Sequence, residues 1–313
     1  MTGLVTLGEA MVVVSANEPG PLAPGRIASL SFAGAEATVA IGVSRLGHPA
    51  AWIGKVGADA AGAMIVAGLR AEGVDVSRVR TEPALATGLM LRERRTADRT
   101  RSAYYRKRLA GSCLGPENVD DELISASRLL HVTGITPALS DSARRAVRHA
   151  VVVAREAGVT VSLDVNYRSL LWSRNDAAAE LGFLVRHADL VFAGPQEAQL
   201  LVGDAPPEQT ARALTALGPR QAIVKLGAAG ALVAVDGDVL AQPAVPVTVV
   251  DPIGAGDAFV AGYLAAHLDG APPAERLLTA ATCGSFAVSV HGDWEGLPRQ
   301  GELPLLTGDD VIR

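Results

Sequence analysis

The chain has 313 residues, 49% of them hydrophobic, so it can bury a sizeable core in one large α/β domain or two small ones. Its net charge is −5, its pI is near 5.7 and no block of Lys or Arg stands apart, which argues against nucleic acid and anionic membranes as partners. The two cysteines lack metal-ligand spacing, and neither a signal-like N-terminus nor a run of about 18 apolar residues occurs, so we expect a reduced, cytoplasmic protein.

The first quarter of the chain predicts strands and two helices around a proline-rich loop. Strands are expected at 4–7, 11–15, 29–32 and 51–56, and helices at 35–46 and 59–72. The segment 18–25 holds three prolines and two glycines and is expected to be a loop. Asp59 is interpreted as the N-cap of the second helix rather than as a catalytic group.

Two arginine-rich segments, 87–94 and 101–107, carry alternating β patterns with no helix between them. They predict a small sheet that projects from the main domain. A strand would place Tyr104 and Arg106 on one face and Tyr105 on the other. A guanidinium near a phenol suits an anionic group such as a carboxylate, which takes paired N–H donors. The plain alternative is an exposed basic strand.

From residue 120 onward, strands and helices alternate. Strands are expected at 128–132, 159–164, 190–192, 222–225 and 230–235, and helices at 140–157, 176–187, 196–201 and 208–217. Repeated βα units predict a parallel sheet with helices on both faces. Because no linker or repeat interrupts them, one domain is expected over 1–313, with the small sheet inserted discontinuously at about 10–33 and 87–110.

The stretch 247–268, VTVVDPIGAGDAFVAGYLAAHL, predicts a buried strand at 247–250, a Gly-Ala-Gly turn and then a helix. The first N–H groups of such a helix have no partner inside it, and together with the helix dipole they suit a phosphate oxygen. Asp257 falls in the first turn. A carboxylate there either caps the helix or accepts a proton from an attacking hydroxyl.

This stretch, DPIGAGDAF followed by Gly262, resembles the C-terminal signature of the ribokinase-like (PfkB) carbohydrate kinases. FAGAEATVAIGVSRLG is similar to their N-terminal signature, with Ala in place of the first of two glycines. The resemblance implies a ribokinase-like α/β fold with a β lid over the sugar, and ATP and Mg²⁺ as cofactors. It implies Asp257 as the catalytic base. The backbone that would form the anion hole belongs to Gly254, Ala255 and Gly256.

Further blocks indicate a sugar site. Arg168 follows a predicted parallel strand, where ligands of α/β sheets bind, although a surface salt bridge explains it equally well. DVNYRSLLW and GDWEG resemble blocks of the family's keto-sugar-acid kinases, which implies that Arg168 contacts a sugar acid and that Asp293 reaches its hydroxyls; a turn is the alternative for Asp293. Gly34 would let the backbone touch the sugar, or simply form a turn. Met90 stands where that subfamily has Tyr, which removes a hydroxyl donor.

The nucleotide site is implied by weaker matches. KLGAAG, with Lys225, Gly227 and Gly230, resembles the family's K-x-G-x-x-G turn beside the nucleotide, for which a plain hairpin is the alternative. GPQE resembles the N-x-x-E motif that organises magnesium and phosphate. Glu197 matches it, but Gly194 stands where Asn is usual, and a Glu at a helix start is also ordinary dipole chemistry.

A helix expected at 280–290 is interpreted as core. The family places the adenine beside this helix, and small residues there would make room for a flat base. These small residues include Gly284 and Ala287.

The leading expectation is an ATP-dependent kinase of the primary hydroxyl of 2-keto-3-deoxygluconate, giving the 6-phosphate, with Asp257 as general base and Arg106 and Arg168 holding the carboxylate. The alternatives are a PfkB kinase of a neutral sugar such as fructose, ribose or 5-keto-2-deoxygluconate, and a sugar-binding protein without catalysis. A dinucleotide-dependent dehydrogenase is disfavoured, because no G-x-G-x-x-G follows the first strand. Homo-oligomerisation is left open.

Overall fold

A mostly parallel sheet forms the centre of the molecule. Within residues 3–96 and 100–308, which the computed structural model describes, this sheet has eight strands in the order β14-β13-β12-β11-β10-β9-β1-β4. The strands from β4 through β12 pair in parallel, and β13 and β14 join antiparallel at one edge. Their bounds are β1 Leu4–Leu7, β4 Ala50–Ile53, β9 Leu129–Thr133, β10 Thr160–Asp164, β11 Leu190–Ala193, β12 Gln221–Lys225, β13 Ala231–Val235 and β14 Asp238–Gln242.

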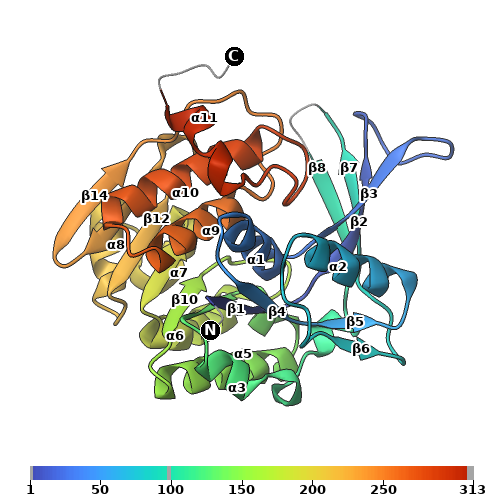
Figure 1. The fold of residues 1–313 in the computed structure, drawn as a ribbon, viewed down its shortest axis with the longest axis horizontal. Coiled ribbons are helices and arrows are strands. Elements are labelled where there is room, and N and C mark those ends of the chain that lie inside the picture. Colours follow the sequence, from blue (N-terminus) through green and yellow to red (C-terminus); the bar gives the residue numbers. More distant parts are fainter. Residues whose placement is uncertain (1–2, 97–99, 309–313) are drawn as a thin grey trace.

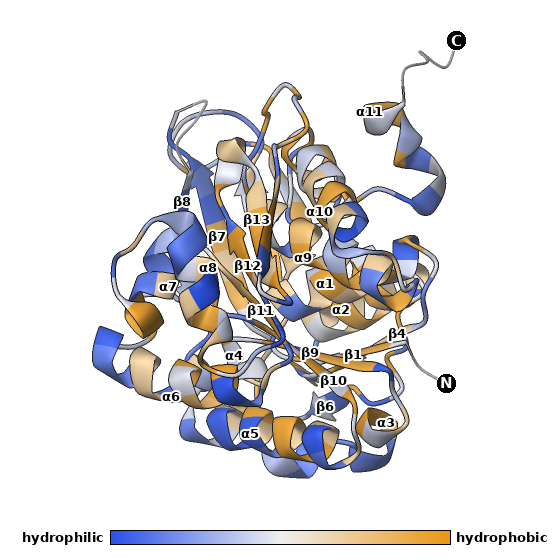
Figure 2. Ribbon diagram, turned by 90° about the vertical axis from the view of Figure 1, so that its left-hand side faces the viewer, coloured by the Kyte–Doolittle hydropathy of each residue, from blue (hydrophilic) through white to orange (hydrophobic). Residues whose placement is uncertain are grey.

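Helices cover both faces of this sheet (Figures 1 and 2). One face packs against α5 and α6, and the other against α1 and α9, with α10 packed on α9. Strands such as β1 and β11 are buried along their whole length, as expected for parallel strands covered on both sides. The helices are α1 Ala35–Arg45, α2 Ala60–Ala71, α3 Asp121–Ser125, α4 Thr136–Leu139, α5 Asp141–Glu156, α6 Arg174–His187, α7 Pro195–Val202, α8 Pro207–Thr215, α9 Ala255–Leu268, α10 Pro273–Val288 and α11 Pro304–Thr307.

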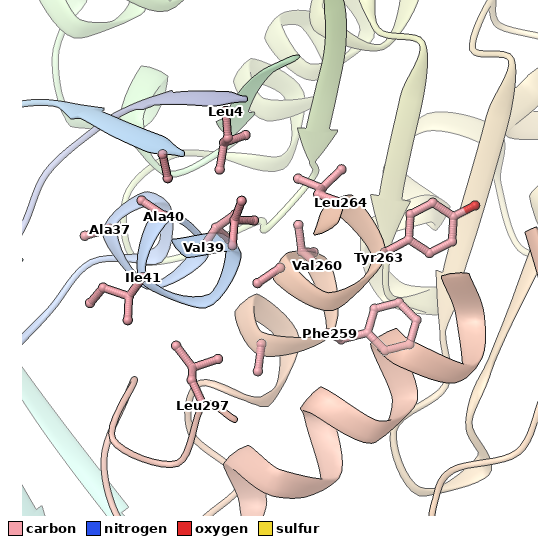
Figure 3. Packing of buried hydrophobic residues seen from close by; sticks show 14 of the residues in the cluster. Leu4, Ala37, Val39, Ala40, Ile41, Phe259, Val260, Tyr263, Leu264 and Leu297 are labelled. Atoms are coloured by element: carbon pink, nitrogen blue, oxygen red, sulfur yellow. The ribbon is translucent and has the colours of Figure 1, made fainter. Parts of the chain in front are cut away.

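The core around α1 and α9 holds α9 in place. Val39 of α1 points toward Val260 and Leu264 of α9, and these residues belong with Ile41 to one buried cluster (Figure 3). Helix α9 is buried on nearly all sides, as expected for a helix that is hydrophobic all round. Its position is therefore set by packing, and its N-terminus is held rigidly beside the carboxyl ends of the parallel strands.

A second sheet stands apart from the main one (Figure 1). Its four strands, in the order β3-β2-β7-β8 within the described residues, are β2 Met11–Ala16, β3 Ala28–Ala33, β7 Leu89–Arg94 and β8 Thr100–Tyr105. We call this sheet the lid. It combines strands from both predicted segments, of which residues 97–99 lie outside the described part. The expected fold class, a mostly parallel sheet with helices on both faces and a small separate sheet, is confirmed.

The predicted N-cap at Asp59 is confirmed, whereas two of the predicted strands differ from the structure. Asp59 Oδ1 accepts the N–H of Gly62 at 2.8 Å, and Ser140 Oγ caps α5. The strand expected at 51–56 is divided, because β5 (Lys55–Gly57) leaves the main sheet to pair with β6 (Arg80–Glu82). The buried strand expected at 247–250 is absent: this segment is largely exposed and forms no strand.

The segment 247–250 fails to form a strand because it finds no partner strand. The sheet edge is β14, which ends at Gln242, and Pro243 and Pro246 follow, where proline cannot donate to a ladder. The N–H of Val250 bonds instead to the carbonyl of Val288 at the end of α10. Apolar, β-branched composition alone therefore gave the wrong local structure here. Among the described residues, no helix has both the length and the apolarity needed to cross a membrane.

Candidate functional site

Two neighbouring cavities lie between the lid and the carboxyl ends of the main-sheet strands. Their volumes are about 1220 Å³ and about 770 Å³, and we call them the larger and the smaller cavity. This is the edge at which ligands of open α/β sheets bind. Both cavities are lined by Met90, Ser102, Tyr104, Tyr167, Arg168, Asp257 and Asp293. The two spaces therefore meet along a common wall that contains Asp257.

The N-terminus of α9 opens into the larger cavity. Gly254 is its N-cap, with a left-handed φ of 76°, and a Cβ at this position would collide with the carbonyl oxygen of Asp293. Only glycine fits such a position without strain. Gly254, Gly256 and Asp257 line the cavity, while Ala255 begins the helix. The first N–H groups of α9, which lack partners inside the helix, are thus available to an anion.

Asp257 is in the first turn of α9, as predicted. Burial raises the pKa of its carboxyl to about 7, and the negative charge of Asp164 adds to this, whereas Lys225 and Arg168 lower it. Asn166, a buried residue with a left-handed φ of 36°, donates from Nδ2 to Asp257 Oδ1 at 3.4 Å. A carboxylate with such a pKa is well matched to accepting a proton near neutral pH.

Lys225 and Glu197 lie on the larger cavity. Lys225 Nζ donates to both carboxylate oxygens of Asp164, at 2.8 and 2.7 Å. Burial opposes the lysine charge, but the carboxylates of Asp164 and Glu197 outweigh it and raise the lysine pKa. Burial also raises the pKa of Glu197, and Asp164 adds to this. The cavity thus has a cation held between carboxylates.

The Glu197 carboxylate is anchored by backbone donors. Its oxygens accept the N–H of Tyr167 at 3.1 Å and that of Gly194 at 2.7 Å. Among the described residues, no group of three or more His, Cys, Asp or Glu side chains is arranged to hold a metal. The Glu197 carboxylate on the larger cavity is an oxygen donor of the kind Mg²⁺ takes when its other ligands are phosphate oxygens and water, which is the usual mode for this ion.

The five residues predicted for the sugar all line the smaller cavity: Gly34, Tyr104, Arg106, Arg168 and Asp293. A Cβ at Gly34 would collide with the carbonyl oxygen of Glu9, so close packing by itself requires glycine there. The guanidinium of Arg106 lies 5.7 Å from the ring centre of Tyr104, as the strand pattern suggested. The structure therefore gathers these residues from the lid, α1 and the ends of the sheet.

The two predicted arginines differ in their environment. Arg106 is paired: its Nε donates to Glu9 Oε2 at 2.6 Å, and its Nη2 contacts the same oxygen. Glu9 is only 3% exposed, and burial raises its pKa to about 7. Arg168, in contrast, is exposed and has no carboxylate within ion-pair distance among the described residues. Arg168 lines both cavities, and its positive charge lowers the pKa of both Asp257 and Glu197.

Asp293 is also already paired, with a residue that the sequence analysis missed. Arg92 Nη1 and Nη2 donate to its two carboxylate oxygens at 2.8 and 3.0 Å. Arg92 alternates with Met90 along β7, so the same period-two pattern that placed Tyr104 could have placed it in the cavity. Glu9 carried no comparable local signal, because its partner is 97 residues away.

Some predicted nucleotide residues are not on the cavity walls. Gly227 and Gly230, with φ of 60° and 95°, form the turn between β12 and β13. Gly284 lies beside the first residue of α9, and Ala287 is 4% exposed in the core. None of these four is among the residues that line the two cavities within the described part of the chain. The larger cavity instead has an apolar wall that the analysis missed, made by Val249 and Val250.

Comparisons with known proteins bear on the family and the fold of this chain. A family model described as pfkB family carbohydrate kinase matches residues 1–300. The 2-dehydro-3-deoxygluconokinase of Thermoproteus tenax is 39% identical over 306 residues, covering 96% of this chain and 93% of the relative. The protein of the same name from Bacillus subtilis (strain 168) is 36% identical over 302 residues, with the same two coverages. An E. coli structure described as a ribokinase II candidate in complex with ATP and Mg²⁺ has a TM-score of 0.90 and 27% identity, covering 98% of this chain and 99% of that chain.

Proposed function

The chain belongs to the pfkB family of carbohydrate kinases, and on that premise we propose that it transfers the γ-phosphate of ATP to the primary hydroxyl of 2-keto-3-deoxygluconate, giving the 6-phosphate. The position of Asp257 carries the proposal. It is on the wall that the two cavities share. The larger cavity has a helix N-terminus and a lysine, and the smaller cavity has the residues predicted for the sugar. The names of two relatives, both 2-dehydro-3-deoxygluconokinase, support the substrate.

Asp257 acts as the general base in this mechanism. It accepts the proton of the primary hydroxyl as that oxygen attacks the γ-phosphorus in line. The free N–H groups of Ala255, Gly256 and Asp257 at the start of α9 hold the oxygens of the transferring group, which gain charge in the transition state. Asn166 holds Asp257 Oδ1 in place. The hydroxyl oxygen and the γ-phosphate would meet where the two cavities adjoin.

The nucleotide side is formed by the larger cavity. Lys225, partly balanced by Asp164, supplies positive charge for the phosphates, and Glu197 would hold Mg²⁺ with the carboxylate lone pairs that the N–H groups of Tyr167 and Gly194 do not use. When bound, Mg²⁺ neutralises phosphate charge. Contacts of Gly227, Gly230, Gly284 and Ala287 with the nucleotide stay predictions, and the exposed Val249 is a further candidate to contact the base.

The acceptor side is formed by the smaller cavity. Arg168 binds the substrate carboxylate, because its guanidinium has five donors and no protein carboxylate to satisfy among the described residues. Arg106 has part of its charge balanced by Glu9 and adds a hydrogen bond rather than a full charge. Gly34 and Tyr104 contact the sugar chain. The lid would exclude water, which otherwise competes as the acceptor.

We treat residues 1–313 as one domain, and a cytoplasmic location and homo-oligomerisation stay predictions.

The rival is phosphorylation of a different acceptor, either a neutral sugar such as fructose or ribose, or 5-keto-2-deoxygluconate, which is not neutral because it carries a carboxylate of its own. One observation favours a neutral sugar: the pairing of Arg106 with Glu9 leaves a single uncompensated arginine, Arg168, in the acceptor cavity. Met90 points the same way, because it lacks the hydroxyl that Tyr would offer.

A substrate panel decides between them. Purified protein is given MgATP with 2-keto-3-deoxygluconate, its galactonate-derived epimer, fructose, ribose or 5-keto-2-deoxygluconate, and ADP release is followed. A kcat/KM for 2-keto-3-deoxygluconate or its epimer at least tenfold above that of fructose, ribose and 5-keto-2-deoxygluconate supports the proposal. The variant Asp257→Asn measures the background. A higher kcat/KM with fructose, ribose or 5-keto-2-deoxygluconate refutes it, and so does ADP release no faster than with water alone for the whole panel.

A further inference from the structure

The catalytic helix and the lid are joined by one short path of contacts. We propose that Arg92 is a positioning residue that couples the lid to the start of α9 through Asp293. The proposal rests on the kinase function proposed above. It adds a residue whose role is to place the anion-binding amides correctly when the lid is in position.

The first link is the ion pair between β7 and the loop after α10. Arg92 is 6% exposed and uses both terminal nitrogens, at 2.8 and 3.0 Å, on the two oxygens of Asp293. The sulfur of Met90 is 3.8 Å from Arg92 Nη2, which restricts the guanidinium further. Such a two-point pair fixes orientation as well as distance. It joins residues 201 positions apart, one from the lid and one from the body.

The second link is the backbone of Asp293. Its carbonyl oxygen packs so closely on Gly254 that no Cβ could be accommodated there. Gly254 is the N-cap of α9, and its carbonyl accepts the first helical bond, from the N–H of Ala258 at 2.9 Å. A displacement of Asp293 would therefore move the residue from which the anion-binding amides begin.

The third link ties the same loop to a second lid strand. The indole N–H of Trp294 donates to the carbonyl of Phe32 in β3 at 3.1 Å, and their ring centres lie 4.9 Å apart with the ring planes tilted by 30°. The carboxylate of Glu295 accepts from Ser31 Oγ. Asp293 and its two successors thus contact β7 and β3, while Asp293 also touches α9. A packed contact of this kind passes on small displacements, because protein interiors have few voids to absorb them.

The test compares Arg92→Met, which removes the charge and the fork at similar length, with Arg92→Lys, which keeps the charge alone. The matched control is Arg148→Met. Arg148 makes the same kind of two-point pair with the buried Glu180, at 2.9 and 2.6 Å, between α5 and α6 and away from both cavities. All three variants are assayed with the best acceptor from the panel.

We expect Arg92→Met to lower kcat by roughly tenfold to a hundredfold, the range produced by a small misplacement of catalytic groups. The KM for ATP should stay within about twofold of wild type, Arg92→Lys should recover part of kcat, and Arg148→Met should leave kcat unchanged. Asp293→Asn combined with Arg92→Met should be no worse than the poorer single variant, since one path is being broken. An unchanged kcat in Arg92→Met, or an equal loss in Arg148→Met, overturns the proposal.

A readout without substrate separates this proposal from the proposed function. Amide hydrogen exchange at 258–261, the first hydrogen-bonded turn of α9, should quicken several-fold in Arg92→Met and stay as in wild type in Arg148→Met. Faster exchange in Arg92→Met, together with no turnover of any sugar acid by the wild-type protein, would support the coupling and refute the proposed substrate. Unchanged exchange at 258–261 together with normal turnover would refute the coupling alone.

Discussion

Lys225 and Asp164 form a buried ion pair at the centre of the site, with Lys225 Nζ at 2.8 and 2.7 Å from the two carboxylate oxygens. Asp164 ends β10 and Lys225 ends β12, so the pair spans the end of β11. The charge of Asp164 raises the pKa of both Asp257 and Glu197, and that of Lys225 lowers it. The pair therefore adjusts two carboxylates at once, and the acid–base behaviour of the site depends on it.

The activity should depend on pH through Asp257. A general base works only when ionised, and burial raises the pKa of Asp257 to about 7. We therefore expect kcat/KM for the acceptor to fall about tenfold per pH unit below pH 7 and to level off above it. Initial rates between pH 5 and 9, at saturating MgATP, measure this. A flat profile down to pH 5 would show that another group accepts the proton.

Lys225→Met should move this profile. Without the lysine charge, Asp164 is uncompensated, the pKa of Asp257 rises, and the acid limb of kcat/KM shifts to higher pH. Removing one partner of a buried pair should also cost about 3–5 kcal/mol of stability, which thermal or urea unfolding would detect. The double variant Lys225→Met with Asp164→Asn is the control, because it removes both charges and should restore part of the stability. If the acid limb of kcat/KM does not shift in Lys225→Met, the charge of Lys225 does not control the pKa of Asp257.

Asp257→Asn should lower kcat by at least about a hundredfold, the low end of a general-base contribution, because the amide cannot accept the proton. The side chain keeps its size, so the start of α9 and its free N–H groups stay in place. Binding of ATP, measured by calorimetry without acceptor, should change little. Turnover at the wild-type rate would assign the base to a different residue.

Arg168→Ala should weaken binding of a sugar acid selectively. The loss of a charge-assisted hydrogen bond is worth about 1.5–3 kcal/mol, so KM for the acid should rise roughly tenfold to a hundredfold. A neutral sugar should show little change. The KM of Arg168→Lys for the acid should lie between those of wild type and Arg168→Ala, because the ammonium keeps the charge without the two-point geometry. Equal increases in KM for acid and neutral sugars would show that Arg168 does not bind the substrate carboxylate.

Met90→Tyr tests the departure from the subfamily pattern. Met90 is 3% exposed, lines both cavities and pairs across the lid with Tyr104. A new hydroxyl in this wall could add one hydrogen bond of about 1 kcal/mol and lower the KM for 2-keto-3-deoxygluconate about fivefold. The larger ring costs stability, about 1–3 kcal/mol for overpacking. Met90→Leu, which adds no polar group, is the control, and a raised KM with Tyr would show that the native acceptor uses this space.

Much of the site was predictable because its parts are local. The family, the start of α9 with Asp257 in its first turn, and the cap at Asp59 all follow from residues within a few positions of one another. Turn sterics, capping bonds and hydrophobic period act over that range, so the sequence carries them directly. The segment 247–250 shows the limit, since its strand-like composition had no neighbouring strand to pair with.

The sequence by itself thus determined the fold class, the family and the anion-binding turn. The tertiary structure alone decided which charges meet: Arg106 with Glu9, and Arg92 with Asp293. These partners are 97 and 201 residues apart, and each pair joins the lid to the body. An ion pair depends on the distance between two side chains in space, which is set by the strand order and by the position of the lid on the main domain. No local pattern of residue types encodes that distance.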